Sequence, residues 1–172
     1  MKGVLDMNYV IRKRIIDDCS AIQHIITKSW NETYKGIVND EFLNSLKNNE
    51  HERINNSISK FNEKDNNYLV LEIDSKVVGF VKYGASKDKK YGEINAIYIL
   101  SEYKGMGLGR KLIESAVKEL KKMNYNEYII GCLDGNKAND FYKHLGGKLI
   151  DTRIFKNTGE DLKENVYLFK IK

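Results

Sequence analysis

Residues 102–111, EYKGMGLGRK, decide the fold of this chain. Three glycines alternate within five residues, directly after an apolar segment and directly before an amphipathic one. Glycine lets a backbone adopt φ > 0 and approach a ligand closely. The first turn of a helix carries unpaired N–H groups and the positive end of the helix dipole. The stretch therefore predicts a phosphate or pyrophosphate site, to which Arg110 and Lys111 add positive charge.

Length and composition predict one globular domain. The 172 residues are 41% apolar and 31% charged, which is typical of a soluble chain that buries a substantial core. No window approaches about 18 uncharged apolar residues, and residues 1–8 lack the apolar region of a signal peptide. We expect a single cytoplasmic domain over residues 1–172, with no membrane segment, as a monomer or a homodimer.

Charge and cysteine content argue against two further classes. The net charge is +5, and basic residues are interleaved with acidic ones, so nucleic-acid binding is not expected. Cys19 and Cys132 lie far apart without metal-ligand spacing, so neither a metal site nor a disulfide is expected.

Hydrophobic periodicity predicts a mixed α/β sheet rather than an alternating, doubly wound one. Strands are expected over residues 9–15, 68–73, 77–85, 92–100, 127–133, 148–155 and 166–171. Helices are expected from residue 17 or 18 toward Tyr34, within residues 40–61, over residues 107–123 and over residues 136–145. One right-handed crossover joins two parallel strands in the middle, and antiparallel strands surround it.

The helical region over residues 40–61 is the least regular of these elements. Residues 47–52 are too polar to assign. The expected buried side comprises Phe42, Leu43, Leu46, Ile54, Ile58 and Phe61.

The glycine stretch differs from two well-known nucleotide-binding patterns. The spacing of a P-loop, G-x-x-x-x-G-K-[ST], is absent. A dinucleotide fingerprint needs G-x-G-x-x-G early in a parallel unit, whereas here the third glycine comes one residue too soon and three antiparallel strands precede it. An ordinary glycine-rich loop before a helix stays open as the structural alternative.

Two motifs resemble the GNAT acetyltransferase superfamily. Lys104-x-x-Gly107-x-Gly109 follows residues 96–99, AIYI, and is similar to the family's acetyl-coenzyme A signature, in which Gln or Arg usually stands in place of Lys104. Residues 135–147, GNKANDFYKHLGG, resemble the family's N-x-A-x-x-F-Y-x-x-x-G segment, one strand further on. The resemblance covers nearly the whole chain. It implies the GNAT fold, a largely antiparallel twisted sheet of about seven strands with about four helices.

The resemblance also implies how acetyl-coenzyme A is held. Backbone amides of about residues 105–110 would bind the pyrophosphate, and backbone groups of Ile97 and Ile99 would pair with the pantetheine arm as with another strand. Asn136 would bond the pantetheine or its thiol end. The cofactor-binding residues expected on this basis are Ile97, Tyr98, Ile99, Lys104, Gly105, Met106, Gly107, Leu108, Gly109, Arg110 and Asn136.

Acetyl transfer to an amine sets its own requirements. A lysine-like amine has a pKa of about 10.4, so a base must accept its proton, and an acid assists the leaving thiolate. Tyr142 matches the family's tyrosine and is the candidate general acid, with a core aromatic beside Phe141 as the alternative. Glu93 is the candidate general base, acting through water, with a solvated strand-end carboxylate as the alternative. A main-chain N–H near Ile97 is the candidate oxyanion donor.

Residues 30–37, WNETYKGI, resemble the substrate-side loop of the bacterial small-molecule and polyamine acetyltransferase branch. The aromatic faces of Trp30 and Tyr34, together with Glu32, would suit a cationic amine, whereas the structural alternative is a helix end packed on the sheet. Cys132 is interpreted as a small core residue, with an acetyl-cysteine intermediate as the alternative.

The sequence therefore predicts an acetyl-coenzyme A-dependent N-acetyltransferase. Its acceptor would be the primary amine of a small molecule, a polyamine among the candidates, attacking directly in a ternary complex. A protein N-terminus or lysine is the alternative acceptor. A non-catalytic acyl-coenzyme A-binding module is the alternative from another class.

Overall fold

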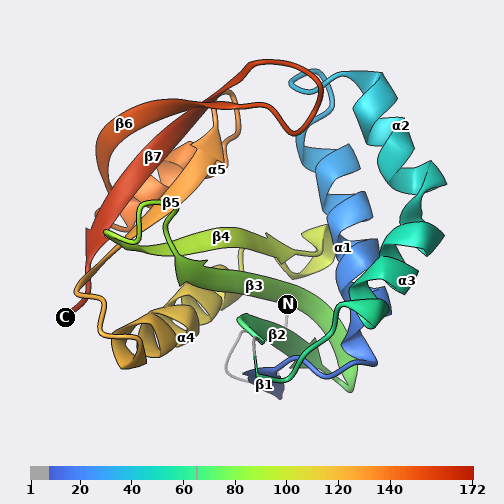
Figure 1. Ribbon diagram of the computed structural model, residues 1–172, viewed down its shortest axis with the longest axis horizontal. Helices are drawn as coiled ribbons and strands as arrows, with labels where there is room; N and C mark the ends of the chain where they lie inside the picture. The colour runs from blue at the N-terminus through green and yellow to red at the C-terminus, as the bar shows by residue number, and fades with distance from the viewer. Residues whose placement is uncertain (1–7, 65) are drawn as a thin grey trace.

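The computed structural model describes residues 8–64 and 66–172, which form one seven-stranded sheet in the order β1-β2-β3-β4-β5-β7-β6 (Figure 1). The strands are β1 (Tyr9–Lys13), β2 (Tyr68–Ile73), β3 (Lys76–Ala85), β4 (Gly92–Ile99), β5 (Glu127–Leu133), β6 (Lys148–Phe155) and β7 (Leu162–Lys170). The helices are α1 (Asp18–Thr33), α2 (Asp40–Asn48), α3 (Glu50–Ser59), α4 (Leu108–Lys122) and α5 (Ala138–His144), and a short 3₁₀ turn, η2, covers Ser101–Tyr103. The mixed α/β class and the seven strands are confirmed.

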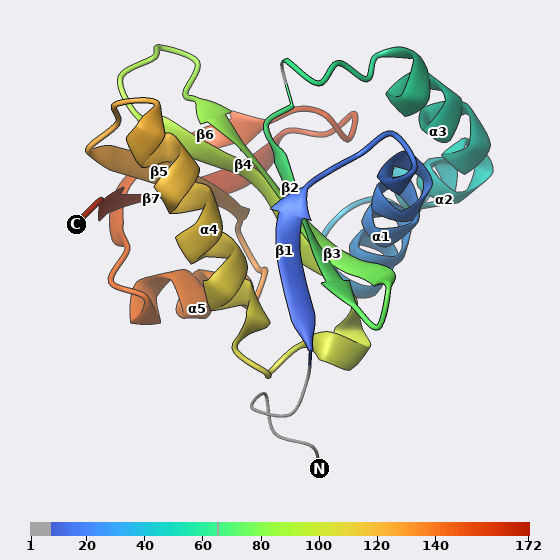
Figure 2. The same ribbon diagram turned by 90° about the horizontal axis from the view of Figure 1, so that it is seen from below.

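Helices cover both faces of the sheet, as Figure 2 shows for the half formed by β1 to β4. On one face, Ile22 and Ile25 of α1 pack against Val70 and Phe80. On the other face, the apolar side of α4, including Leu112, belongs to the largest core cluster. Alternate residues of each strand therefore serve two separate apolar layers. No helix among the residues that the structure describes is both long and apolar enough to cross a membrane.

The helical region over residues 40–61 is two helices rather than one. The side chain of Asn39 caps α2 by accepting a hydrogen bond from the backbone N–H of Phe42 at 2.7 Å, and α2 ends at Asn48 with Asn49 as its C-cap. This break falls within the polar stretch 47–52 and resets the helical phase. The expected burial of Ile58 is consequently wrong, because its side chain is 41% exposed, and all ten residues of α3 lie at least partly exposed.

Strand β7 begins at Leu162, four residues before the expected start at Val166. Residues 162–165, LKEN, lack an apolar alternation, but all four pair with β6, and Glu164 and Asn165 also pair with β5. Glu164 stands opposite Leu133 of β5 and opposite Arg153 of β6. Tertiary pairing therefore extends a strand that its own sequence does not predict.

Strands β4 and β5 run parallel and diverge soon after they meet. Their register within residues 8–64 and 66–172 comprises three pairs and ends where Ile94 faces Ile130. The next residue of β4, Asn95, is a bulge against β3, where the register shifts between Lys82 and Tyr83. A bulge bends and twists its strand. We call the opening between β4 beyond Ile94 and β5 beyond Ile130 the splay.

Candidate functional site

The turn before α4 exposes a row of backbone N–H groups. Gly105 and Gly107 adopt φ of +77° and +74°, which side chains rarely tolerate, and Gly107 is the N-cap of α4. The first bond into the helix runs from the N–H of Lys111 to the carbonyl of Gly107 at 3.3 Å. The N–H groups of residues 105–110 donate to no backbone carbonyl within the described chain. This arrangement suits an anion at the helix N-terminus.

A cavity of about 1,070 Å³, which we call the outer cavity, adjoins this turn. It lies between the glycine turn, the end of α1 and the start of α5. All but two of the expected cofactor-binding residues line it: Ile97, Ile99, Lys104, Gly105, Gly107, Leu108, Gly109, Arg110 and Asn136. Met106 packs instead against the core, and Tyr98 lines a second cavity. Glu32, expected on the acceptor side, also lines the outer cavity.

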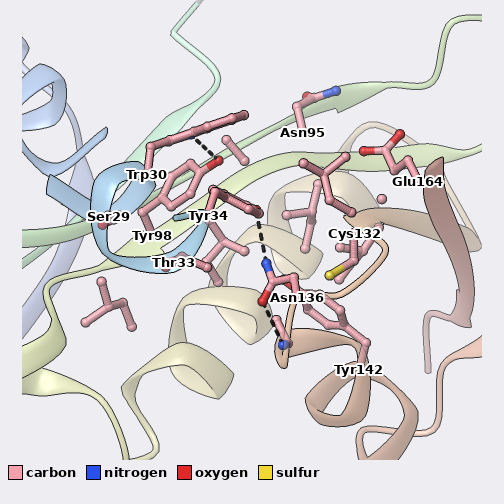
Figure 3. A pocket seen from close by; sticks show the side chains of 18 of the residues that line it. Ser29, Trp30, Thr33, Tyr34, Asn95, Tyr98, Cys132, Asn136, Tyr142 and Glu164 are labelled. Carbon is pink, nitrogen blue, oxygen red and sulfur yellow. Dashed lines mark hydrogen bonds between the residues drawn. The ribbon is translucent and has the colours of Figure 1, made fainter. Parts of the chain in front are cut away.

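The second cavity, of about 200 Å³, fills the splay, and we call it the inner cavity. It shares Asn136 and Tyr142 with the outer cavity, so the two adjoin. Figure 3 shows its polar lining, in which Cys132 and Tyr142 approach from the α5 side and Trp30 and Tyr34 from α1. A ligand in the outer cavity therefore has a route through the sheet toward α1.

Hydrogen bonds fix the polar groups of the inner cavity. The indole N–H of Trp30 donates to the hydroxyl of Tyr98 at 2.8 Å. The amide Nδ2 of Asn136 donates to the hydroxyl of Tyr34 at 3.0 Å, while its Oδ1 accepts from the N–H of Ala138 at 2.9 Å. Both Asn136 bonds are drawn in Figure 3. Burial is the main cause that raises the pKa of Tyr34 to about 12, so this hydroxyl stays neutral.

Tyr142 and Cys132 are two buried residues for which the sequence suggests a chemical role. The ring of Tyr142 is buried, and its hydroxyl forms no hydrogen bond to any described residue. Burial, followed by the proximity of Cys132 and Tyr34, raises the pKa of Tyr142 well above its ordinary value. Burial and then the charges of Glu164 and Asp134 raise the pKa of the Cys132 thiol to about 12. This thiol is protonated at neutral pH, which argues against an acetyl-cysteine intermediate.

Glu93 is bound by an arginine. Its Oε1 accepts a hydrogen bond from Nη2 of Arg153 at 2.7 Å, and Nε of the same guanidinium donates to Oε2 of Glu164. We call these three residues the acid–arginine cluster. Glu93 is 7% exposed and lines neither of the two cavities, whereas Glu164 lines the inner one. The carboxylate of Glu93 thus contacts Arg153 rather than either cavity.

Sequence reasoning missed Arg153 and Glu164. The two residues stand directly opposite each other in the β6–β7 hairpin, and opposite charges at such positions are a recognisable cross-strand pair. Because the last strand was expected to start at Val166, Glu164 fell outside the predicted hairpin, and its pairing with Arg153 was not recognised.

Aromatic rings surround Trp30 beside the inner cavity. Its ring centroid lies 4.6 Å from that of Tyr34, 5.3 Å from that of Phe42 and 6.2 Å from that of Phe155. Phe155 comes from β6, at the far end of the sheet order, and it also lines the cavity. The inner cavity thus has an aromatic wall built from both halves of the sheet.

A polar link joins the segment after α1 to the β6–β7 loop, and these two segments meet in Figure 1. Nδ2 of Asn39 donates to the carbonyl of Thr158 at 3.0 Å and to Oε2 of Glu160 at 2.7 Å. We call these contacts the loop link. It joins the two segments that follow Tyr34 and Phe155, which are aromatic residues that line the inner cavity.

Comparison with known proteins assigns this chain to a family. Residues 22–146 match the model of the acetyltransferase (GNAT) family, so the chain belongs to that family of N-acetyltransferases, whose cofactor is acetyl-coenzyme A. The chain is 26% identical to the uncharacterized N-acetyltransferase YuaI of Bacillus subtilis (strain 168), over 90% of this chain and 88% of that protein. It is 27% identical to spermidine N(1)-acetyltransferase of Thermoplasma acidophilum, over 85% of this chain and 92% of that protein.

A solved structure shares the fold. PaiA N-acetyltransferase from Thermoplasma acidophilum, crystallised in complex with coenzyme A, superposes with a TM-score of 0.74. The match covers 95% of this chain and 99% of that one at 22% identity. At this identity the likeness concerns the fold.

Proposed function

We propose that this protein transfers the acetyl group of acetyl-coenzyme A to the primary amine of a small molecule by direct attack in a ternary complex, with polyamines as the leading acceptors. The observation that carries the proposal is the pair of adjoining cavities. The outer one meets unpaired backbone donors at α4, and the inner one crosses the splay to the aromatic residues around Trp30. Cofactor and acceptor would thus enter from opposite faces and meet inside the sheet.

The residues of the outer cavity fit acetyl-coenzyme A. The N–H groups of residues 105–110 offer donors to a pyrophosphate, and Lys104 and Arg110 add positive charge. Beyond Ile94, β4 has no described strand on its β5 side, so its backbone is free to pair with an extended arm. The bound cofactor supplies an acetyl group activated as a thioester.

The chain's own residues would assist the transfer on both sides of the acetyl group. The hydroxyl of Tyr142 keeps its proton at neutral pH and donates a hydrogen bond toward the leaving sulfur. A main-chain N–H of β4 near Ile97 faces the developing oxyanion. On the acceptor side, the acid–arginine cluster brings the carboxylate of Glu164 to the cavity, and Glu93 acts through Arg153.

A small-molecule acceptor is favoured over a protein by the size of the inner cavity. A volume of about 200 Å³ with walls from both halves of the sheet accepts one compact arm better than a folded chain. The similarity to a spermidine acetyltransferase supports an amine with several charges.

A panel of amines with detection of released thiol tests the proposal. Acetyl-coenzyme A is mixed with polyamines, simple alkylamines, peptides with free N-termini and lysine peptides. We expect thiol release with polyamines or alkylamines. Release with peptides alone would establish the protein acceptor. Thermal stabilisation by the cofactor without thiol release for any amine would establish the non-catalytic module.

A further inference from the structure

The carboxylate of Glu164 is bound on one of its two oxygens. Oε2 accepts from Nε of Arg153, while Oε1 forms no hydrogen bond to any of the residues that the structure describes. The side chain is only 12% exposed, and it lines the inner cavity. Oε1 is thus accessible to a ligand or a water molecule in the cavity, either of which could donate the missing hydrogen bond. Glu164 therefore offers an open acceptor position inside the cavity.

Gly131 of β5 makes room for this carboxylate. A Cβ at Gly131 would lie 2.6 Å from Cδ of Glu164 and 3.0 Å from Nη2 of Arg153, and it would overlap Oε1 of Glu164. Gly131 also lines the inner cavity. Glu164 and Arg153 thus occupy the space that a side chain at residue 131 would fill, and the Glu164 carboxylate lies next to the splay.

The acid–arginine cluster leaves one negative charge uncompensated. Two carboxylates, of Glu93 and Glu164, share the single guanidinium of Arg153. Among the described residues that line the inner cavity, the one cationic side chain is Lys104, which also lines the outer cavity and follows the η2 turn. A second cation at the Glu164 end would balance the remaining charge.

The aromatic residues of the inner cavity also favour a cation. Trp30, Tyr34 and Phe155 line the same cavity, and aromatic faces attract ammonium groups. Tyr34 is neutral at physiological pH because burial raises its pKa to about 12, so it adds no competing charge. Carboxylate and aromatic faces together discriminate a protonated amine from an uncharged one.

We propose that Glu164 binds the ammonium group of the acceptor amine and thereby selects cationic alkylamines over uncharged amines, with Glu93 as a positioning residue that holds Arg153. This inference rests on the proposed function, because it names the group that the acceptor presents to the same cavity. Both roles concern binding of the charged acceptor before transfer.

Glu164→Gln tests the inference, with Glu93→Gln as the matched control. Each substitution replaces one of the two carboxylates that bind Arg153 with a neutral amide. The amide oxygen can still accept a hydrogen bond from the guanidinium. For a polyamine, we expect Glu164→Gln to lower kcat/KM by about 10- to 100-fold, mainly through KM, as for a lost hydrogen bond to a charged group. Glu93→Gln should raise KM by about threefold or less, because Glu93 contacts Arg153 and does not line the cavity that holds the acceptor.

An arylamine that is uncharged at neutral pH, measured as substrate or as competitive inhibitor, provides the internal comparison. Its kcat/KM or inhibition constant should change little in Glu164→Gln. Equal losses for the charged and uncharged amines, or no loss for either, would overturn the role of Glu164. A wild-type protein that acetylates no amine would overturn the proposed function, which is a different result.

Gly131→Ala keeps the inference testable if Glu164→Gln fails to fold. The added Cβ meets the flexible ends of Glu164 and Arg153 rather than backbone, so we expect a melting temperature close to that of the wild type. The displaced carboxylate should raise KM for the polyamine by about tenfold and leave the affinity for acetyl-coenzyme A unchanged. An unchanged KM for the polyamine would contradict the proposal.

Discussion

The outer and inner cavities adjoin, but they are built from different parts of the chain. The outer cavity depends on backbone, because Gly105 and Gly107 turn a row of N–H groups toward it before α4. The inner cavity depends on side chains, because Trp30, Tyr142 and Glu164 reach it from three separate elements. A site made of backbone groups tolerates any substitution that preserves the turn, whereas a site made of side chains changes when those residues are substituted. We therefore expect cofactor binding and acceptor choice to respond to different substitutions.

The largest effect should come from Gly109→Asp in the outer cavity. A Cβ at Gly109 would lie 3.8 Å from side-chain atoms of Ile99 and Phe141, so the fold accommodates a side chain there. An acidic residue in the first turn stabilises a helix but repels a bound pyrophosphate. Calorimetry should show the Kd for acetyl-coenzyme A rising by more than about 100-fold, with folding intact.

Gly109→Asn is the control for size without charge, and it should weaken binding by about tenfold or less. Equal losses for the two variants would show that space rather than charge matters. An unchanged Kd in Gly109→Asp would remove the helix terminus from the cofactor site.

Tyr142→Phe should affect turnover rather than cofactor affinity. Loss of the hydroxyl removes the donor to the leaving sulfur, so we expect kcat to fall by about 100-fold while the Kd for acetyl-coenzyme A stays within about twofold. Steady-state kinetics and calorimetry measure the two quantities.

Tyr167→Phe is the control for a buried hydroxyl outside both cavities. Tyr167 donates to Oδ1 of Asn139 at 2.8 Å, and its ring lies 6.1 Å from that of Tyr142. This variant should lose about 1 kcal/mol of stability with kcat nearly unchanged. A similar fall in kcat for both variants would assign Tyr142 to packing.

The smallest effect should come from Asn39→Asp in the loop link. Asp preserves the cap of α2 but replaces the amide donor with a carboxylate facing Glu160. We expect KM for the acceptor amine to rise by about threefold and the free energy of unfolding to fall by about 1 kcal/mol. Glu160→Gln, which keeps an acceptor for Asn39, should change KM less. An acceptor KM unaffected by Asn39→Asp would separate the loop link from acceptor binding.

The sequence predicts the outer cavity better than the inner one, for a physical reason. A glycine-rich turn before an amphipathic helix is a local pattern, so the turn follows from residues 102–111, and seven of the residues that line the outer cavity lie within this stretch. Strands over residues 68–73, 127–133 and 148–155 were also predicted with the observed bounds. The bond between Glu93 and Arg153 joins residues 60 positions apart, and it depends on the sheet order and the register of β7. Such pairings leave no local pattern.

The splay has a further consequence for how the two halves of the sheet move. Strands β4 and β5 share three residue pairs, so little main-chain bonding joins β1 to β4 with β5 to β7 across this seam. Amide protons on the unpaired flank of β4 should exchange rapidly with deuterium in the free protein. A ligand that fills the seam as an extra strand would slow that exchange, and the melting temperature would rise with the logarithm of its concentration above its Kd. The splay would then also be the flexible connection between the two halves of the sheet, and cofactor binding would make it more rigid.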